Sequence, residues 1–119
     1  MYIEASLMRP GQKAQLLTSD LRGSSTPQCL IFYYHMYGSG TGILSVLLRH
    51  GSREHDVLLW RRRGEQSVSW IRAMVDYHCN VRHQVQKRLK QCELSNHTVL
   101  RSLFHCLLFR LQIRLTHCC

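Results

Sequence analysis

The sequence predicts an all-β protein folded as a sandwich of two antiparallel sheets. Short apolar segments rich in aromatic and β-branched residues recur along residues 1–85, separated by turns that contain Gly, Pro and Ser. This part of the chain lacks the 3.6-residue period of an amphipathic helix. With 119 residues, 45% of them hydrophobic, the chain has the size and composition of one globular domain.

The first strands are predicted on either side of a proline–glycine turn. Met1–Ala5 and Ala14–Thr18 are short apolar stretches. In Arg9–Gly11 between them, proline fixes one turn dihedral and glycine accepts the other. After the loop Gly23–Pro27, Cys29–Tyr37 offers nine residues rich in strand-forming types. It is the strongest predicted strand.

Three further strands are predicted before residue 78. The turn Gly38–Gly42 joins Cys29–Tyr37 to a strand at Ile43–Arg49 and so predicts a hairpin. Asp56–Arg61 forms the next strand, and Val68–Tyr77 follows after Gly64-Glu65-Gln66.

The composition changes abruptly at Gln86, which predicts a boundary between a domain at residues 1–85 and a tail at residues 86–119. The tail is expected to be either helical or disordered. Its apolar run, Val99–Leu115, has 17 residues, whereas a spanning helix needs about 20. Arginines inside the run would each cost roughly 2.5–3.5 kcal/mol in a bilayer. We therefore expect no transmembrane helix, and an interfacial helix remains the membrane option. These arginines are Arg101, Arg110 and Arg114.

Charge and cysteine content restrict the class of protein. The net charge of +9 favours acidic partners such as nucleic acid, anionic lipid or sulfated glycans, and residues 86–119 contribute six basic residues against one acidic. Six cysteines in a short chain favour an oxidising compartment. Met1–Ser6 lacks the basic and apolar regions of a signal peptide, so none is expected at this N-terminus.

A series of segments, in order, resembles the MAM (meprin/A5/mu) domain family. The residues that carry the resemblance are Met1–Ser6, Pro10–Ser19, Cys29–Gly38, Gly42–Val46, Leu59-Trp60, Gly64-Glu65-Gln66, Trp70, Ala73 and Val75. Asp76–Gln84 is similar to repeats of proteins that alternate MAM and LDL-receptor class A modules. The resemblance implies an extracellular, jelly-roll-like β-sandwich that mediates adhesion, dimerisation and protein recognition.

The chain departs from the family pattern at both ends. A complete MAM domain begins earlier, with a first cysteine pair and opening strands. After Val85 the family pattern expects an apolar strand, whereas this chain has Gln86–Lys90. The resemblance therefore implies a partial MAM domain at residues 1–85. Residues 86–119 would be a non-family tail arising from alternative splicing, intron read-through or a gene-model error.

The resemblance also suggests disulfide candidates. Cys29 and Cys79 stand where cysteines occur in the family or in the subset named above. A bridge between them would stabilise the domain by roughly 2–4 kcal/mol. Two reduced, buried thiols are the alternative. Asn96-His97-Thr98 is an N-glycosylation sequon, which matters only if the tail reaches the secretory lumen.

Large aromatic residues are expected to pack in the core rather than to form a ligand platform. They are Phe32, Tyr34, Tyr37, Trp60 and Trp70. His35 is likewise expected to be a core histidine with its hydrogen bonds satisfied. The run Arg61-Arg62-Arg63 is either a solvated strand end or a contact for a polyanion.

Metal binding and catalysis have little support. A zinc site could use Cys79-x3-His83, Cys92-x4-His97 and His117-Cys118-Cys119, but the usual short cysteine knuckle is missing. No nucleophile elbow, Walker loop or His-Glu-x-x-His motif is present. Without a carboxylate pair at defined spacing, no general acid and base can be assigned. We therefore expect no catalytic residue, cofactor or metal.

The expected function is a non-enzymatic, extracellular adhesion and protein-recognition module of a secreted or membrane-anchored multi-domain parent. Its partners would be proteins, a second MAM-type domain among them. No nucleic acid or small-molecule substrate is expected, and membrane contact would come through the parent or weakly through the tail. Two alternatives stay open. One is a non-functional or regulatory isoform with a membrane-associating basic tail, and the other is a small zinc- or polyanion-binding protein.

Overall fold

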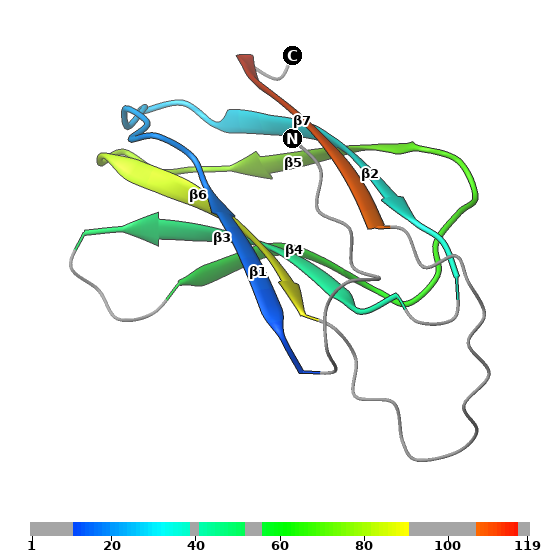
Figure 1. Ribbon diagram of the computed structural model, residues 1–119. Helices are drawn as coiled ribbons and strands as arrows, with labels where there is room; N and C mark the ends of the chain where they lie inside the picture. The colour runs from blue at the N-terminus through cyan, green and yellow to red at the C-terminus, as the bar shows by residue number, and fades with distance from the viewer. Residues whose placement is uncertain (1–10, 39–40, 52–55, 91–106, 117–119) are drawn as a thin grey trace.

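The computed structural model describes residues 11–38, 41–51, 56–90 and the backbone of 107–116. These residues form seven strands and no helix, which confirms the all-β prediction (Figure 1). The strands are β1 Lys13–Leu17, β2 Gln28–Met36, β3 Ile43–His50, β4 Val57–Arg63, β5 Ile71–Tyr77, β6 His83–Lys90 and β7 Leu107–Thr116. The part of the chain described thus contains no helix long and apolar enough to cross a membrane.

The strands form two antiparallel sheets in separate layers, seen in Figure 1 with β5, β2 and β7 in the upper one. One sheet has the order β1-β6-β3-β4 and the other has the order β5-β2-β7. Only the β3–β4 connection joins two successive strands of the same sheet. Every other connection crosses between the layers, as expected for the jelly-roll-like sandwich.

The core lies between the sheets and is built from alternate residues of each strand, because successive side chains of a strand point to opposite faces. β2 contributes its even-numbered residues, from Leu30 to Met36. The other buried core residues are Leu44, Val46, Leu48, Ala73, Val75, Tyr77, Cys79, Val85 and Leu89.

Strand β6 crosses the domain boundary that the sequence predicts after residue 85. It pairs with β1 on one side and with β3 on the other. Val85 and Leu89, on either side of the predicted boundary, are both core residues. Residues 86–90 therefore belong to the four-stranded sheet, although their composition is polar.

Leu107–Thr116 forms strand β7 and pairs with β2, rather than forming a helix. From Phe109 to Thr116 the sequence alternates apolar and polar residues, which is the period of a strand with one buried face. The strand predicted at Met1–Ala5 lies outside the described residues.

Candidate recognition surface

The loop at residues 64–70, at one end of the three-stranded sheet, is hydrogen-bonded to strand β2. The amides of Gln66 and Ser67 donate hydrogen bonds to the Met36 carbonyl over 2.9 and 3.2 Å. His35 Nε2 lies 2.9 Å from the carbonyl oxygen of Val68. Gly64, with φ of 72°, opens this loop in a conformation that glycine adopts without strain. Residues 64–70 are thus held beside the end of β2, and strand β5 begins only at Ile71.

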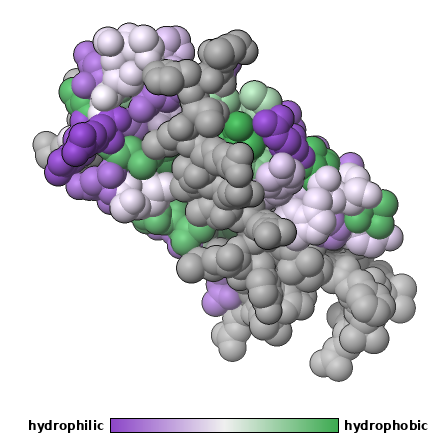
Figure 2. Space-filling model, turned by 90° about the horizontal axis from the view of Figure 1, so that it is seen from above, coloured by the Kyte–Doolittle hydropathy of each residue, from purple (hydrophilic) through white to green (hydrophobic). Residues whose placement is uncertain are grey.

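Exposed aromatic and apolar side chains gather around His35 on this loop and strand. The imidazole lies 5.7 Å from the Trp70 ring and 6.3 Å from the Tyr37 ring, centre to centre. Tyr37 is 42% exposed, Trp70 44% and Val68 69%. We call His35, Tyr37, Val68 and Trp70 the aromatic patch. On the face drawn in Figure 2, the coloured surface shows hydrophobic residues in separate areas between hydrophilic ones.

Two of the five aromatic residues predicted for the core are not in it. Phe32 and Tyr34 are buried, and half-buried Trp60 meets both of them edge-on at 5.1 and 5.0 Å. The prediction is wrong for Tyr37 and Trp70, which are exposed. Tyr37 follows the end of β2 and Trp70 precedes the start of β5, so neither lies on a strand face between the two sheets.

His35 does not occupy the core either. It is half-buried, and its neighbours in β2, Tyr34 and Met36, are the ones that face the opposite sheet. Its Nδ1 atom is buried without a hydrogen-bond partner. Among the described residues, the hydrogen bond of His35 is therefore made by Nε2, to the Val68 carbonyl, while its ring contacts Tyr37 and Trp70.

The two disulfide candidates do not pair with each other. Cys79 has a free, buried thiol that donates to the Val81 carbonyl over 3.5 Å. Cys29 is fully buried and is disulfide-bonded. Cys79 belongs to the core cluster, whereas Cys29 precedes Leu30 on the opposite face of β2. The two sulfurs therefore lie on different sides of the three-stranded sheet.

The residues described contain no group of three or more His, Cys, Asp or Glu side chains placed to hold a metal ion. His83 uses both ring nitrogens, with Nε2 3.0 Å from the Tyr77 hydroxyl and Nδ1 2.9 Å from the Val81 carbonyl oxygen. Burial raises the pKa of Tyr77, and the nearby Cys79 raises it further. The other zinc candidates and the sequon residue lie outside the described residues: Cys92, Asn96, His97, His117, Cys118 and Cys119.

The side chains of the three consecutive arginines of β4 do not all lie on the same face of the four-stranded sheet. Arg61 and Arg63 pair with Ser45 and Ile43 and share the outer face with them. Arg62 points the other way, with its guanidinium 4.8 Å from the centre of the Trp60 ring. Sequence reasoning missed the basic residues that join Arg61 on the outer face, because only the strand register brings them together. They are Lys13, Arg88 and Lys90.

Two antiparallel sheets packed face to face around one core define a jelly-roll-like β-sandwich. The family model of the MAM domain, meprin/A5/mu, matches residues 1–96. The chain belongs to this family.

The relatives are much longer proteins. The chain is 60% identical over 85 residues to MAM domain-containing protein 2 of Mus musculus, and 50% identical over 86 residues to thyroid hormone-induced protein B of Xenopus laevis. Each alignment covers 71% of this chain and 12% of the relative. Neuropilin-1 of Xenopus laevis is 37% identical over 79 residues, 66% of this chain and 8% of the relative. The chain thus spans about one eighth of the first two relatives.

Proposed function

We propose that this chain is an extracellular recognition module that binds a protein partner through the aromatic patch and contributes binding surface rather than catalysis. One observation carries the proposal: Tyr37 and Trp70 are each more than 40% exposed and are held in place by contacts with His35. Exposed aromatic side chains on a rigid frame bind with little loss of conformational entropy, and Tyr and Trp dominate the energetic centres of protein interfaces.

The extracellular location is supported by the cysteine chemistry and by a relative. Disulfides such as that of Cys29 persist in oxidising compartments. A relative that is 38% identical over 77 residues is MAM domain-containing glycosylphosphatidylinositol anchor protein 1 of Gallus gallus, whose name records a lipid anchor. The small share of each relative that the chain covers favours a role as one module of a larger protein.

The first partner to test is a second copy of the same chain, because the resemblance to MAM domains implies dimerisation as well as adhesion. Beads coated with the full chain should aggregate, as followed by light scattering. The double variant Tyr37→Ala/Trp70→Ala should prevent aggregation, because truncating central aromatic residues of an interface commonly costs about 2 kcal/mol or more each.

A matched control tests whether any exposed apolar pair has the same effect. Val57 and Leu58 of β4 are 48% and 47% exposed and lie on the other sheet. Val57→Ala/Leu58→Ala should leave aggregation unchanged. Wild-type beads that stay dispersed would overturn self-recognition, and equal aggregation by the Tyr37/Trp70 variant would overturn the role of the patch.

A further inference from the structure

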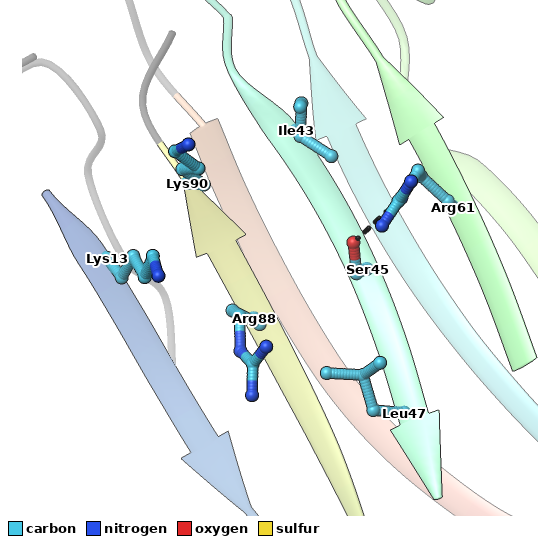
Figure 3. Close-up of a pocket in the computed structure, with 7 residues that line it drawn as sticks. All are labelled: Lys13, Ile43, Ser45, Leu47, Arg61, Arg88 and Lys90. Atoms are coloured by element: carbon cyan, nitrogen blue, oxygen red, sulfur yellow. Dashed lines mark hydrogen bonds between the residues drawn. The ribbon is translucent and has the colours of Figure 1, made fainter. Parts of the chain in front are cut away.

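Basic side chains from three strands share the outer face of the four-stranded sheet (Figure 3). Lys13 of β1 pairs with Lys90 of β6, and two residues along β6 Arg88 pairs with Ser45, which also pairs with Arg61 of β4. Alternate residues of a strand share a face, so the register collects these side chains on one side. They surround a cavity of about 140 Å³, which we call the basic hollow. Its lining residues are Lys13, Ile43, Ser45, Leu47, Arg61, Arg88 and Lys90.

The charges of the basic hollow are not balanced. Four lining side chains are cationic, and among the described residues only Arg88 has a carboxylate partner, with its Nη2 3.1 Å from Asp56 Oδ2. Asp56 is shared with Arg49, whose Nε lies 2.9 Å from Oδ1. The hydrogen bond from Arg49 is the main cause that lowers the pKa of Asp56, so this carboxylate is charged and already occupied. The hollow keeps an excess of positive charge.

Lys13 and Lys90 are directly opposite each other across the β1–β6 pair. Residues in this relation have Cβ atoms roughly 5 Å apart, and like charges there destabilise the sheet. An anion bound between the two ammonium groups would be attracted to both and would offset their repulsion. The pair of lysines is therefore unfavourable without an anion and favourable with one bound.

Hydrogen-bond donors of the hollow are available to such an anion. Ser45 Oγ lies 3.4 Å from Arg61 Nε as an acceptor, which leaves its own hydroxyl proton free to donate. Arg88 Nε is buried and has no hydrogen-bond partner. The hollow is smaller than the roughly 300–1,000 Å³ of pockets that enclose small molecules. It fits one charged group of a longer ligand.

We infer that the basic hollow and the surrounding outer face of the four-stranded sheet bind a sulfated polysaccharide. This inference rests on the proposed extracellular function, because anionic lipids concentrate in the cytoplasmic leaflet. Sites that bind single-stranded nucleic acid combine basic and aromatic residues, whereas the apolar lining residues here are Ile43 and Leu47. Cations repeat about 7 Å apart along the strands, which suits an extended chain of repeated sulfates.

Binding of the full chain to immobilised heparin, measured across a series of salt concentrations, tests the inference. The variant Lys13→Glu/Lys90→Glu should bind at least about tenfold more weakly at physiological salt, and its affinity should depend less steeply on salt because fewer counterions are released. The control Arg22→Glu/Arg82→Glu changes the net charge equally. Arg22 and Arg82 are exposed near the opposite end of β6, and this pair should bind close to wild type.

Three results would overturn the inference. One is equal weakening by the two charge-reversal pairs, which would show an effect of net charge alone. The second is equal affinity for heparin and chemically desulfated heparin. The third is affinity for single-stranded DNA or phosphatidylserine vesicles that matches or exceeds the affinity for heparin. Lys13→Glu/Lys90→Glu should leave bead aggregation intact, because the aromatic patch lies on the other sheet, so failure of one proposal is distinguishable from failure of the other.

Discussion

Lys87 places a charged group between the two sheets. It lies between the core residues Val85 and Leu89 on the same, inward face of β6. Its ammonium nitrogen is 4.3 Å from the centre of the Phe32 ring. The nitrogen is buried without a hydrogen-bond partner, and burial lowers the pKa of Lys87 to about 7. The cation–π contact with Phe32 offsets only part of the cost of removing the charge from water.

The lowered pKa of Lys87 predicts that stability depends on pH. The unfolded-state pKa is 10.5, so between pH 7 and 10.5 the unfolded chain binds more protons than the folded chain. The contribution of Lys87 therefore becomes more favourable as pH rises through this window, by at most about 1.4 kcal/mol per pH unit, and its penalty is complete below pH 7. We predict that Lys87→Met raises the free energy of unfolding at pH 7 by about 1–4 kcal/mol.

Urea denaturation at several pH values from 7 to 10 measures this effect. The difference between Lys87→Met and wild type should narrow as pH rises, because wild-type Lys87 loses its charge in the folded state. Lys90→Met, on the exposed face of the same strand, removes only the repulsion with Lys13 and should raise the free energy of unfolding by at most about 1 kcal/mol. A Lys87→Met protein no more stable than wild type at pH 7, or a difference independent of pH, would show that the ammonium is not buried as described.

At the scale of elements, the segment before β2 approaches the segment after β5 too closely for a side chain at Gly23. A Cβ atom there would collide with backbone atoms of Asn80 and Val81. The amide of Ser24 also donates to the Cys79 carbonyl over 2.8 Å, which fixes the approach. Because the colliding atoms are backbone, a side-chain rotation cannot relieve the contact.

We predict that Gly23→Ala destabilises the protein by about 3 kcal/mol, at the upper end of the range for overpacking. Gly64→Ala is the control, since its φ of 72° is strained for alanine but nothing crowds its Cβ position. That variant should cost roughly 1–2 kcal/mol. Thermal unfolding compares the two, and a smaller loss for Gly23→Ala than for Gly64→Ala would contradict the close approach.

The sequence predicted the central strands well and the later ones poorly, for a physical reason. β2 and β3 carry long apolar runs between turn residues, and β4 begins with four apolar residues, so composition alone defines these strands. In β6 the core-facing positions include His83 and Lys87, which hides the alternation expected of a half-buried strand. For β7 the residues alternate from Phe109 onward, but the change of composition and the run without Gly or Pro predicted a helical or disordered tail.

The recognition surfaces were predictable only in part. The basic run in β4 predicted Arg61 as a possible contact for a polyanion. Lys13 and Lys90 are far from Arg61 in sequence, and only the strand register brings them to the same face of the sheet. The exposure of Tyr37 and Trp70 follows from where two strands end. Composition does not determine those positions, because aromatic residues in a sandwich are usually buried.

At the scale of the whole molecule, the sandwich separates two outer surfaces of different chemistry. The three-stranded sheet carries the aromatic patch, and the four-stranded sheet carries the basic hollow. Strand β6 contributes to both faces of the four-stranded sheet. It supplies Arg88 and Lys90 to the outer face and the core residues Val85 and Leu89 to the inner face. The basic hollow, and the core between the two sheets, therefore depend on one claim, that residues 83–90 form an internal strand of a two-sheet sandwich.

Amide hydrogen exchange of the full chain, followed by mass spectrometry, tests this claim most directly. β2, β3 and β6 each have a paired strand on both sides. Their amide hydrogens should therefore exchange more slowly than those of the loop at residues 64–70. Slow exchange in residues 84–89, comparable to that in residues 29–36, is the predicted result. Exchange of residues 84–89 at the rate of an unstructured peptide would contradict the account.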